Sequence, residues 1–137
     1  MLSLYVATIF YSLHYALTLY LGSSFLVQFV DISRVGLIYI ISAALTTYVA
    51  FELSHFLNNF TNYRVALTAA ALEVFALLLL STVTTPWLAI LLFVIQQILV
   101  HVVFVSLSIS LSEVSRRSES GSVRGVYFTI LNFGILA

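Results

Sequence analysis

Four long runs of apolar residues, separated by short polar connections, dominate the pattern along the chain. They cover about residues 2–21, 35–57, 65–83 and 87–111. A helix rises about 1.5 Å per residue, so each run can cross a hydrocarbon core about 30 Å thick. A fifth apolar run, residues 123–137, is shorter than the roughly 20 residues that a spanning helix needs. The pattern therefore predicts four full transmembrane helices and a truncated fifth, all in one membrane domain over residues 1–137.

The small share of charged residues points the same way. The chain is 62% hydrophobic and 7% charged, whereas soluble domains carry about 25% charged residues. We therefore predict an all-α integral membrane protein whose main partner is the lipid bilayer. The net charge of zero offers no basic field for nucleic acid. The absence of cysteine excludes disulfides and thiolate metal sites.

Polar and small residues inside the apolar runs are arranged on particular helix faces. In the first run the polar face comprises Thr8, Tyr11, Ser12, Tyr15 and Thr18, with His14 at its edge, and the opposite face comprises Val6, Ile9, Phe10, Leu13 and Leu17. We expect the polar face to meet protein or a cavity and the apolar face to meet lipid. In the second run, small residues that would let another helix approach closely share one face: Gly36, Ala43, Thr47, Ala50 and Ser54.

The polar connections predict the helix ends and the orientation. Gly22-Ser23-Ser24 is expected to end the first helix, residues 25–34 to form an interfacial connection, and residues 58–64 to form a turn. The connections on one side of the membrane hold Arg64, Arg116, Arg117 and Arg124, while the other side holds only Arg34. The positive-inside rule then predicts a multi-pass protein of the cell membrane with a cytoplasmic N-terminus.

Polar residues within a membrane are functional candidates because they are costly to place there. We interpret five of them as lining a solute cavity: Tyr11, His14, Tyr15, Gln97 and His101. The alternative is hydrogen bonding between helices, worth only about 0.6 kcal/mol on average. Gln96 points about 100° away from Gln97 on an ideal helix, and we assign it to such bonding.

Three further titratable residues have two interpretations each. Glu73 shares a face with alanines near the middle of the third run, and it is either a proton-coupling site or an acid buried against a neighbouring helix. Glu52 and His55, one turn apart, form either a gate or an interfacial pair. The three histidines lie at different predicted depths, which argues against haem ligation. No catalytic motif is present, so we predict neither enzyme activity, cofactor nor metal.

Two connections resemble signatures of the major facilitator superfamily of transporters. Residues 54–64, SHFLNNFTNYR, lie between the second and third helices, where that family has its G-x-L-x-D-R-x-G-R-K/R-x loop. Asn58 stands in the place of the acid, while Arg64 fits the pattern. Arg124-Gly125 resembles the start of the family's fifth helix, and it follows an acid, Glu113, at the end of the fourth.

This resemblance covers the whole chain and implies the first four helices and part of the fifth in the N-terminal six-helix half of such a transporter. It implies a fragment of a longer protein, with the remaining helices of the parent and a small-molecule solute as partners. In the family the first and fourth helices line the cavity. The functional hypothesis is a secondary transporter working by alternating access. The alternative is a small four-helix membrane subunit for assembly or interaction, without transport activity.

Overall fold

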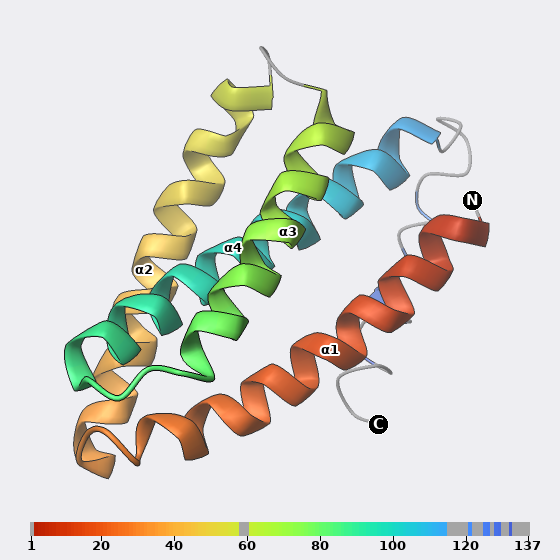
Figure 1. The fold of residues 1–137 in the computed structure, drawn as a ribbon. Helices are drawn as coiled ribbons and strands as arrows, with labels where there is room; N and C mark the ends of the chain where they lie inside the picture. Colours follow the sequence, from red (N-terminus) through yellow and green to blue (C-terminus); the bar gives the residue numbers. More distant parts are fainter. Residues whose placement is uncertain are drawn as a thin grey trace. The chain divides into compact units, whose positions relative to one another are not determined.

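The computed structural model describes residues 2–57 and 61–114, together with residues 121, 125, 126, 128, 129 and 132; side chains are described for residues 5–53, 61–112 and those last six. This part of the chain contains four helices and no strand (Figure 1). The helices are α1 (Leu2–Leu26), α2 (Ile32–Leu57), α3 (Asn62–Leu80) and α4 (Pro86–Val114). The prediction of an all-helical protein is confirmed.

Three of these helices are long and apolar enough to cross a membrane. Among the described residues, the candidate spans are Ile32–Leu53, Asn62–Leu80 and Pro86–Ser112. Judged by length and apolar composition, α1 is not among these spans, so the prediction of a fourth full span at residues 2–21 is wrong. The helix forms, but polar residues such as Thr8, Ser12 and His14 occur at every turn and lower its mean hydropathy. Three apolar helices are consistent with a membrane protein.

The chain forms two compact units. We call Gly22–Ser106 the central unit; it contains the end of α1, α2, α3 and most of α4. We call the other the terminal unit, which combines Met1–Leu21 with Leu107–Ala137. The boundaries fall inside α1 and α4, so each of these helices contributes residues to both units.

The connection between α1 and α2 is shorter than the sequence suggested. Helix α1 continues through Gly22-Ser23-Ser24 to Leu26, so the prediction that these residues end it is wrong. A turn closes the helix, in which the backbone N–H of Val30 donates to the carbonyl of Leu26 over 3.0 Å. Gly22 is helical and buried, and its missing side chain leaves room for the ring of Phe93, because an added methyl carbon would lie 2.8 Å from Phe93 Cε2.

An apolar core joins α2 and α4 inside the central unit. Its buried residues are Leu26, Val35, Ile38 and Phe93. The rings of Tyr39 and Phe93 meet edge to face, with centroids 5.3 Å apart, an arrangement that aromatic pairs favour. Helix α2 thus packs through its Val35–Ile38 face. The small-residue face that we expected to pack is exposed at Ala43 and Thr47, and Gly36 has open space beside it.

A side-chain hydrogen bond joins α3 and α4. Asn62 Nδ2 donates to the backbone carbonyl of Ser106 over 2.8 Å, and both residues are buried. Helix α3 therefore begins at Asn62, inside the stretch 58–64 that we predicted as a turn, and the prediction is wrong for residues 62–64. Asn58, Asn59 and Phe60 lie outside the described residues. The buried face of α3 comprises Asn62, Ala69, Glu73, Ala76 and Leu80.

Many hydroxyl groups on the helices bond within their own helix. Ser12 Oγ donates to the carbonyl of Thr8, and Ser42 Oγ to that of Ile38, each over 2.8 Å. The same pattern recurs at Thr18, Thr47, Thr68 and Ser112. Such bonds satisfy a hydroxyl without a second helix. A serine or threonine on these apolar helices is therefore weak evidence for a polar cavity.

Part of the predicted fifth helix is described. Residues 125, 126, 128, 129 and 132 all have helical backbone. Thr129 Oγ1 donates to the carbonyl of Gly125 over 2.9 Å, and Asn132 Nδ2 donates to that of Phe128 over 2.7 Å. These bonds each span one helical turn, so the residues described here agree with the predicted helical backbone.

Candidate functional site

The polar face of α1 is its more buried face, as the periodicity predicted. Thr8 and Ser12 are buried, and three predicted cavity residues, Tyr11, His14 and Tyr15, are half-buried. The opposite face is exposed at Val6, Ile9, Phe10, Leu13 and Leu17. The rings of Tyr11 and His14 lie 5.8 Å apart on this helix. All of these residues belong to the terminal unit.

The other two predicted cavity residues lie on α4, in the central unit. Gln97 is buried and His101 is half-buried. His101 Nδ1 lies 2.8 Å from the backbone carbonyl of Gln97. A carbonyl oxygen only accepts hydrogen bonds, so Nδ1 is the donor of this bond. The histidine ring is thereby held in one orientation against its own helix.

Gln96 departs from its prediction. We assigned it to bonding between helices, yet it is 1% exposed and neither Nε2 nor Oε1 has a hydrogen-bond partner among the described residues. Gln97 Nε2 also lacks a partner there. The assignment failed because α4 is buried on several faces, so two residues 100° apart are both enclosed. Unlike a hydroxyl, a glutamine amide on a helix does not readily bond back to its own backbone.

Glu73 lies at the level of these glutamines. Helices α3 and α4 are joined by a short connection and run in opposite directions, with Asn62 opposite Ser106. Glu73 lies eleven residues after Asn62 on α3. Ile95, next to Gln96, lies eleven residues before Ser106 on α4. Glu73 is 2% exposed. That it is a proton-coupling site or a structural buried acid stays a prediction. We call Glu73, Gln96 and Gln97 the midspan polar layer.

The remaining predicted site residues are peripheral to this layer or lie outside the described part of the chain. Glu52 is half-buried near the end of α2, and the side chain of His55 is outside the described part. Arg64 is exposed on the first turn of α3, and Gly125 is exposed. The side chain of Glu113 and all of Arg116, Arg117 and Arg124 lie outside the described residues. Within the part described, no three His, Cys, Asp or Glu residues are placed to hold a metal.

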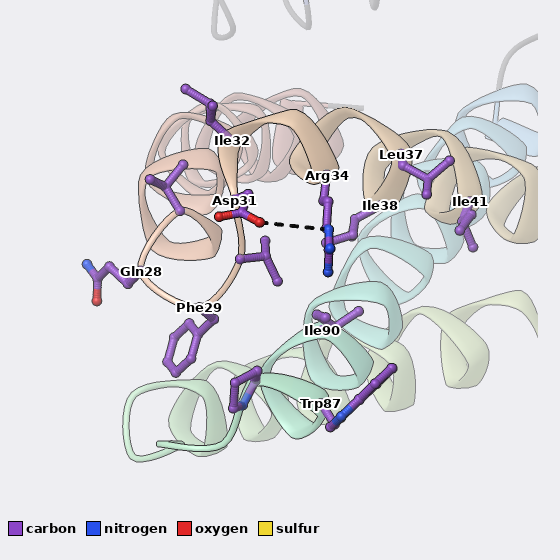
Figure 2. A pocket seen from close by; sticks show the side chains of 13 residues that line it. Gln28, Phe29, Asp31, Ile32, Arg34, Leu37, Ile38, Ile41, Trp87 and Ile90 are labelled. Atoms are coloured by element: carbon purple, nitrogen blue, oxygen red, sulfur yellow. Dashed lines mark ion pairs between the residues drawn. The ribbon is translucent and has the colours of Figure 1, made fainter.

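A groove at one end of the central unit was not predicted at all. It has a volume of about 1020 Å³ and is formed by the α1–α2 connection and the first turns of α2 and α4 (Figure 2). Asp31 and Arg34 lie at its rim, Leu37 and Ile41 along its α2 wall, and Trp87 on α4. Because three separate segments form it, no local pattern in the sequence could reveal it.

No protein-family model, no curated protein and no solved structure matches the chain. The chemistry of the site therefore has to be inferred from its residues. The midspan polar layer offers amide donors, amide acceptors and a carboxyl group inside apolar helices. That combination can hydrogen-bond a small polar solute.

Proposed function

We propose that this chain is part of a membrane transporter that moves a small polar solute by alternating access. The solute would pass the midspan polar layer, with His101 on the same helix. That Tyr11, His14 and Tyr15 of α1 contact a solute stays a prediction from the sequence. We further propose the cytoplasmic N-terminus and the relation to the major facilitator superfamily that the sequence implies. The observation that carries the proposal is the buried amide of Gln96, which has no partner among the described residues.

A purely structural helix would be expected to carry an apolar residue at this position. The 27-residue span Pro86–Ser112 is otherwise strongly apolar. An unpaired buried amide costs about 1–3 kcal/mol, and leucine or methionine would fill the same space without that cost. Intramembrane polar groups are typical of substrate and ion pathways. A solute that bonds to Gln96 and Gln97 would offset the cost whenever it is bound.

The absence of cysteine allows a direct test. Gln97→Cys and His101→Cys are introduced singly, and intact cells are treated with a small, water-soluble thiol reagent. Only a thiol in contact with water forms the reactive thiolate. The transporter proposal predicts that both cysteines react. Two controls bracket the result: Leu91→Cys, on the exposed apolar face of α4, should stay unreacted, and Thr61→Cys, exposed before α3, should react in permeabilised cells.

The alternative function is a membrane subunit for assembly that transports nothing. The observation in its favour is the small-residue face of α2, where Gly36 has no atom within 4 Å of the position that a side chain would take. Another helix could approach closely there. In that case the midspan polar layer would be dry and closed. Failure of both Gln97→Cys and His101→Cys to react, with both controls behaving, would reject the transporter and favour this alternative.

A further inference from the structure

The groove beside Arg34 has the position of a lipid-binding site. It lies where α2 and α4 begin, and both helices are apolar enough to cross a membrane from these ends. Trp87 is 85% exposed there, as expected of a tryptophan at a membrane interface. The groove therefore opens at the boundary between head groups and hydrocarbon.

The wall of the groove is apolar and long enough to contact a lipid acyl chain. Leu37, Ile38 and Ile41 form the wall on α2, and Ile90 faces them from α4 (Figure 2). Ile41 is seven positions after Arg34, which corresponds to about 10 Å along a helix. One leaflet of hydrocarbon is about 15 Å deep. The wall thus follows most of one leaflet.

The rim of the groove carries one positive and one negative group. Arg34 Nε lies 3.9 Å from Asp31 Oδ2, and the two side chains are 72% and 79% exposed. An exposed pair at this distance is weak, so both groups can turn to a ligand at small cost. A guanidinium binds a phosphate through two parallel hydrogen bonds. A carboxylate accepts hydrogen bonds from a primary ammonium group.

We propose that this groove binds one phospholipid with an ethanolamine head group. The phosphate bonds to Arg34, the ammonium bonds to Asp31, and one acyl chain lies along Leu37 and Ile41. The charges on the head group complement the pair on the protein. A choline head group has no N–H to donate, and a glycerol head group has no cation for Asp31. The groove should therefore prefer ethanolamine phospholipid to both.

The test compares three lipids with identical acyl chains, carrying ethanolamine, choline or glycerol head groups. The full chain is purified in detergent, mixed with each lipid, and the lipid retained per protein is measured by native mass spectrometry. One ethanolamine phospholipid should be retained most strongly. Arg34→Ala should weaken its retention at least about tenfold, the loss expected from a charge-assisted hydrogen bond. Asp31→Asn should retain phospholipid but no longer distinguish ethanolamine from choline.

Arg64→Ala is the matched control, since Arg64 is an exposed arginine at the start of another apolar helix. It should leave retention unchanged. Equal retention of the three lipids by the unaltered chain would overturn the proposal, as would loss of ethanolamine phospholipid in Arg64→Ala to the same degree as in Arg34→Ala. Retention of no lipid would also overturn it and would indicate that another helix covers the groove. Thermal unfolding of each variant excludes a general loss of fold, and Arg34→Lys, which keeps the charge without the paired donors, should retain lipid to an intermediate degree.

Discussion

Asn62 donates from Nδ2 to the backbone carbonyl of Ser106 over 2.8 Å, and this bond joins residues 44 positions apart in the sequence. It fixes the start of α3 against α4 and thereby sets which residues of the two helices share a level. The midspan polar layer follows from that register, because Glu73 and Gln96 are nearly the same number of residues from the bond.

We expect Asn62→Ala to destabilise the chain by about 1 kcal/mol, the net value of a typical hydrogen bond. Ser106→Ala is the matched variant. It keeps the accepting backbone carbonyl and removes a buried hydroxyl that has no partner among the described residues, so it should be neutral or slightly stabilising. Thermal unfolding in detergent measures both. Equal destabilisation by the two variants would contradict the role given to this bond.

At Gly22, the space available to a side chain decides the outcome of a substitution. An added methyl group would lie 2.8 Å from Phe93 Cε2 and 3.3 Å from Tyr39 Oη. Phe93 is 2% exposed and cannot move aside freely. We expect Gly22→Ala to cost about 1–3 kcal/mol in the free energy of unfolding, as overpacking does. Phe93→Leu should recover part of that cost in the double variant, because the smaller side chain leaves room.

Gly36 serves as the control for this experiment. It also lies in a helix, but its missing side chain faces open space. Gly36→Ala should therefore stabilise the chain by about 0.5–1 kcal/mol, since glycine loses more backbone entropy than alanine on forming a helix. If the two alanine variants change the free energy of unfolding in opposite directions, the close contact with Phe93, and not the loss of glycine itself, matters at position 22. Stabilisation by Gly22→Ala would be the contrary result.

Periodicity predicted the features that depend on one helix alone. It located all four helices, the buried polar face of α1 and the buried alanine face around Glu73. It misplaced the end of α1 because Gly-Ser-Ser usually interrupts a helix, whereas Phe93 packs over Gly22 here. It misplaced the start of α3 because the partner of Asn62 lies on another helix. Each of these two errors came from a contact between residues distant in sequence.

In the candidate site, too, features of a single helix were easier to predict than contacts between helices. Gln97 and His101 stay cavity predictions that rest on their spacing along one face, whereas Gln96 was assigned to bonding that the described residues do not provide. The prediction assumed that only one face of α4 is buried, whereas this helix is buried on several faces. The groove could not be predicted at all, since it depends on how the α1–α2 connection meets the start of α4.

The proposed orientation can be tested at Gln28 and Thr61, which are exposed in successive connections on either side of α2. If arginines mark the cytoplasmic side, a cysteine at position 28 should react with an impermeant maleimide on intact cells, and one at position 61 should react only after permeabilisation. Neither substitution alters an arginine, so the charge balance that sets orientation is kept. The reverse pattern of labelling would reverse the proposed orientation of α2.

Replacing Gln96 by methionine separates the effect of its amide on protein stability from its effect on transport. Methionine is close to glutamine in size and shape, so Gln96→Met removes a buried amide without opening a cavity. Because the amide has no partner among the described residues, we expect the variant to be more stable by about 1–3 kcal/mol, the cost of an unpaired buried polar group. Gln28→Met, at an exposed position, should change the free energy of unfolding by less than about 0.5 kcal/mol.

The same variant also bears on the proposed function. If a solute bonds to Gln96, the methionine variant gains stability and loses transport, as happens where a site keeps a costly group for function. Transport is measured with the protein reconstituted in vesicles, and stability by unfolding in detergent. Unchanged transport would exclude Gln96 from the solute path. A loss of stability would instead mean that the amide is satisfied in the folded protein and that its burial needs no functional explanation.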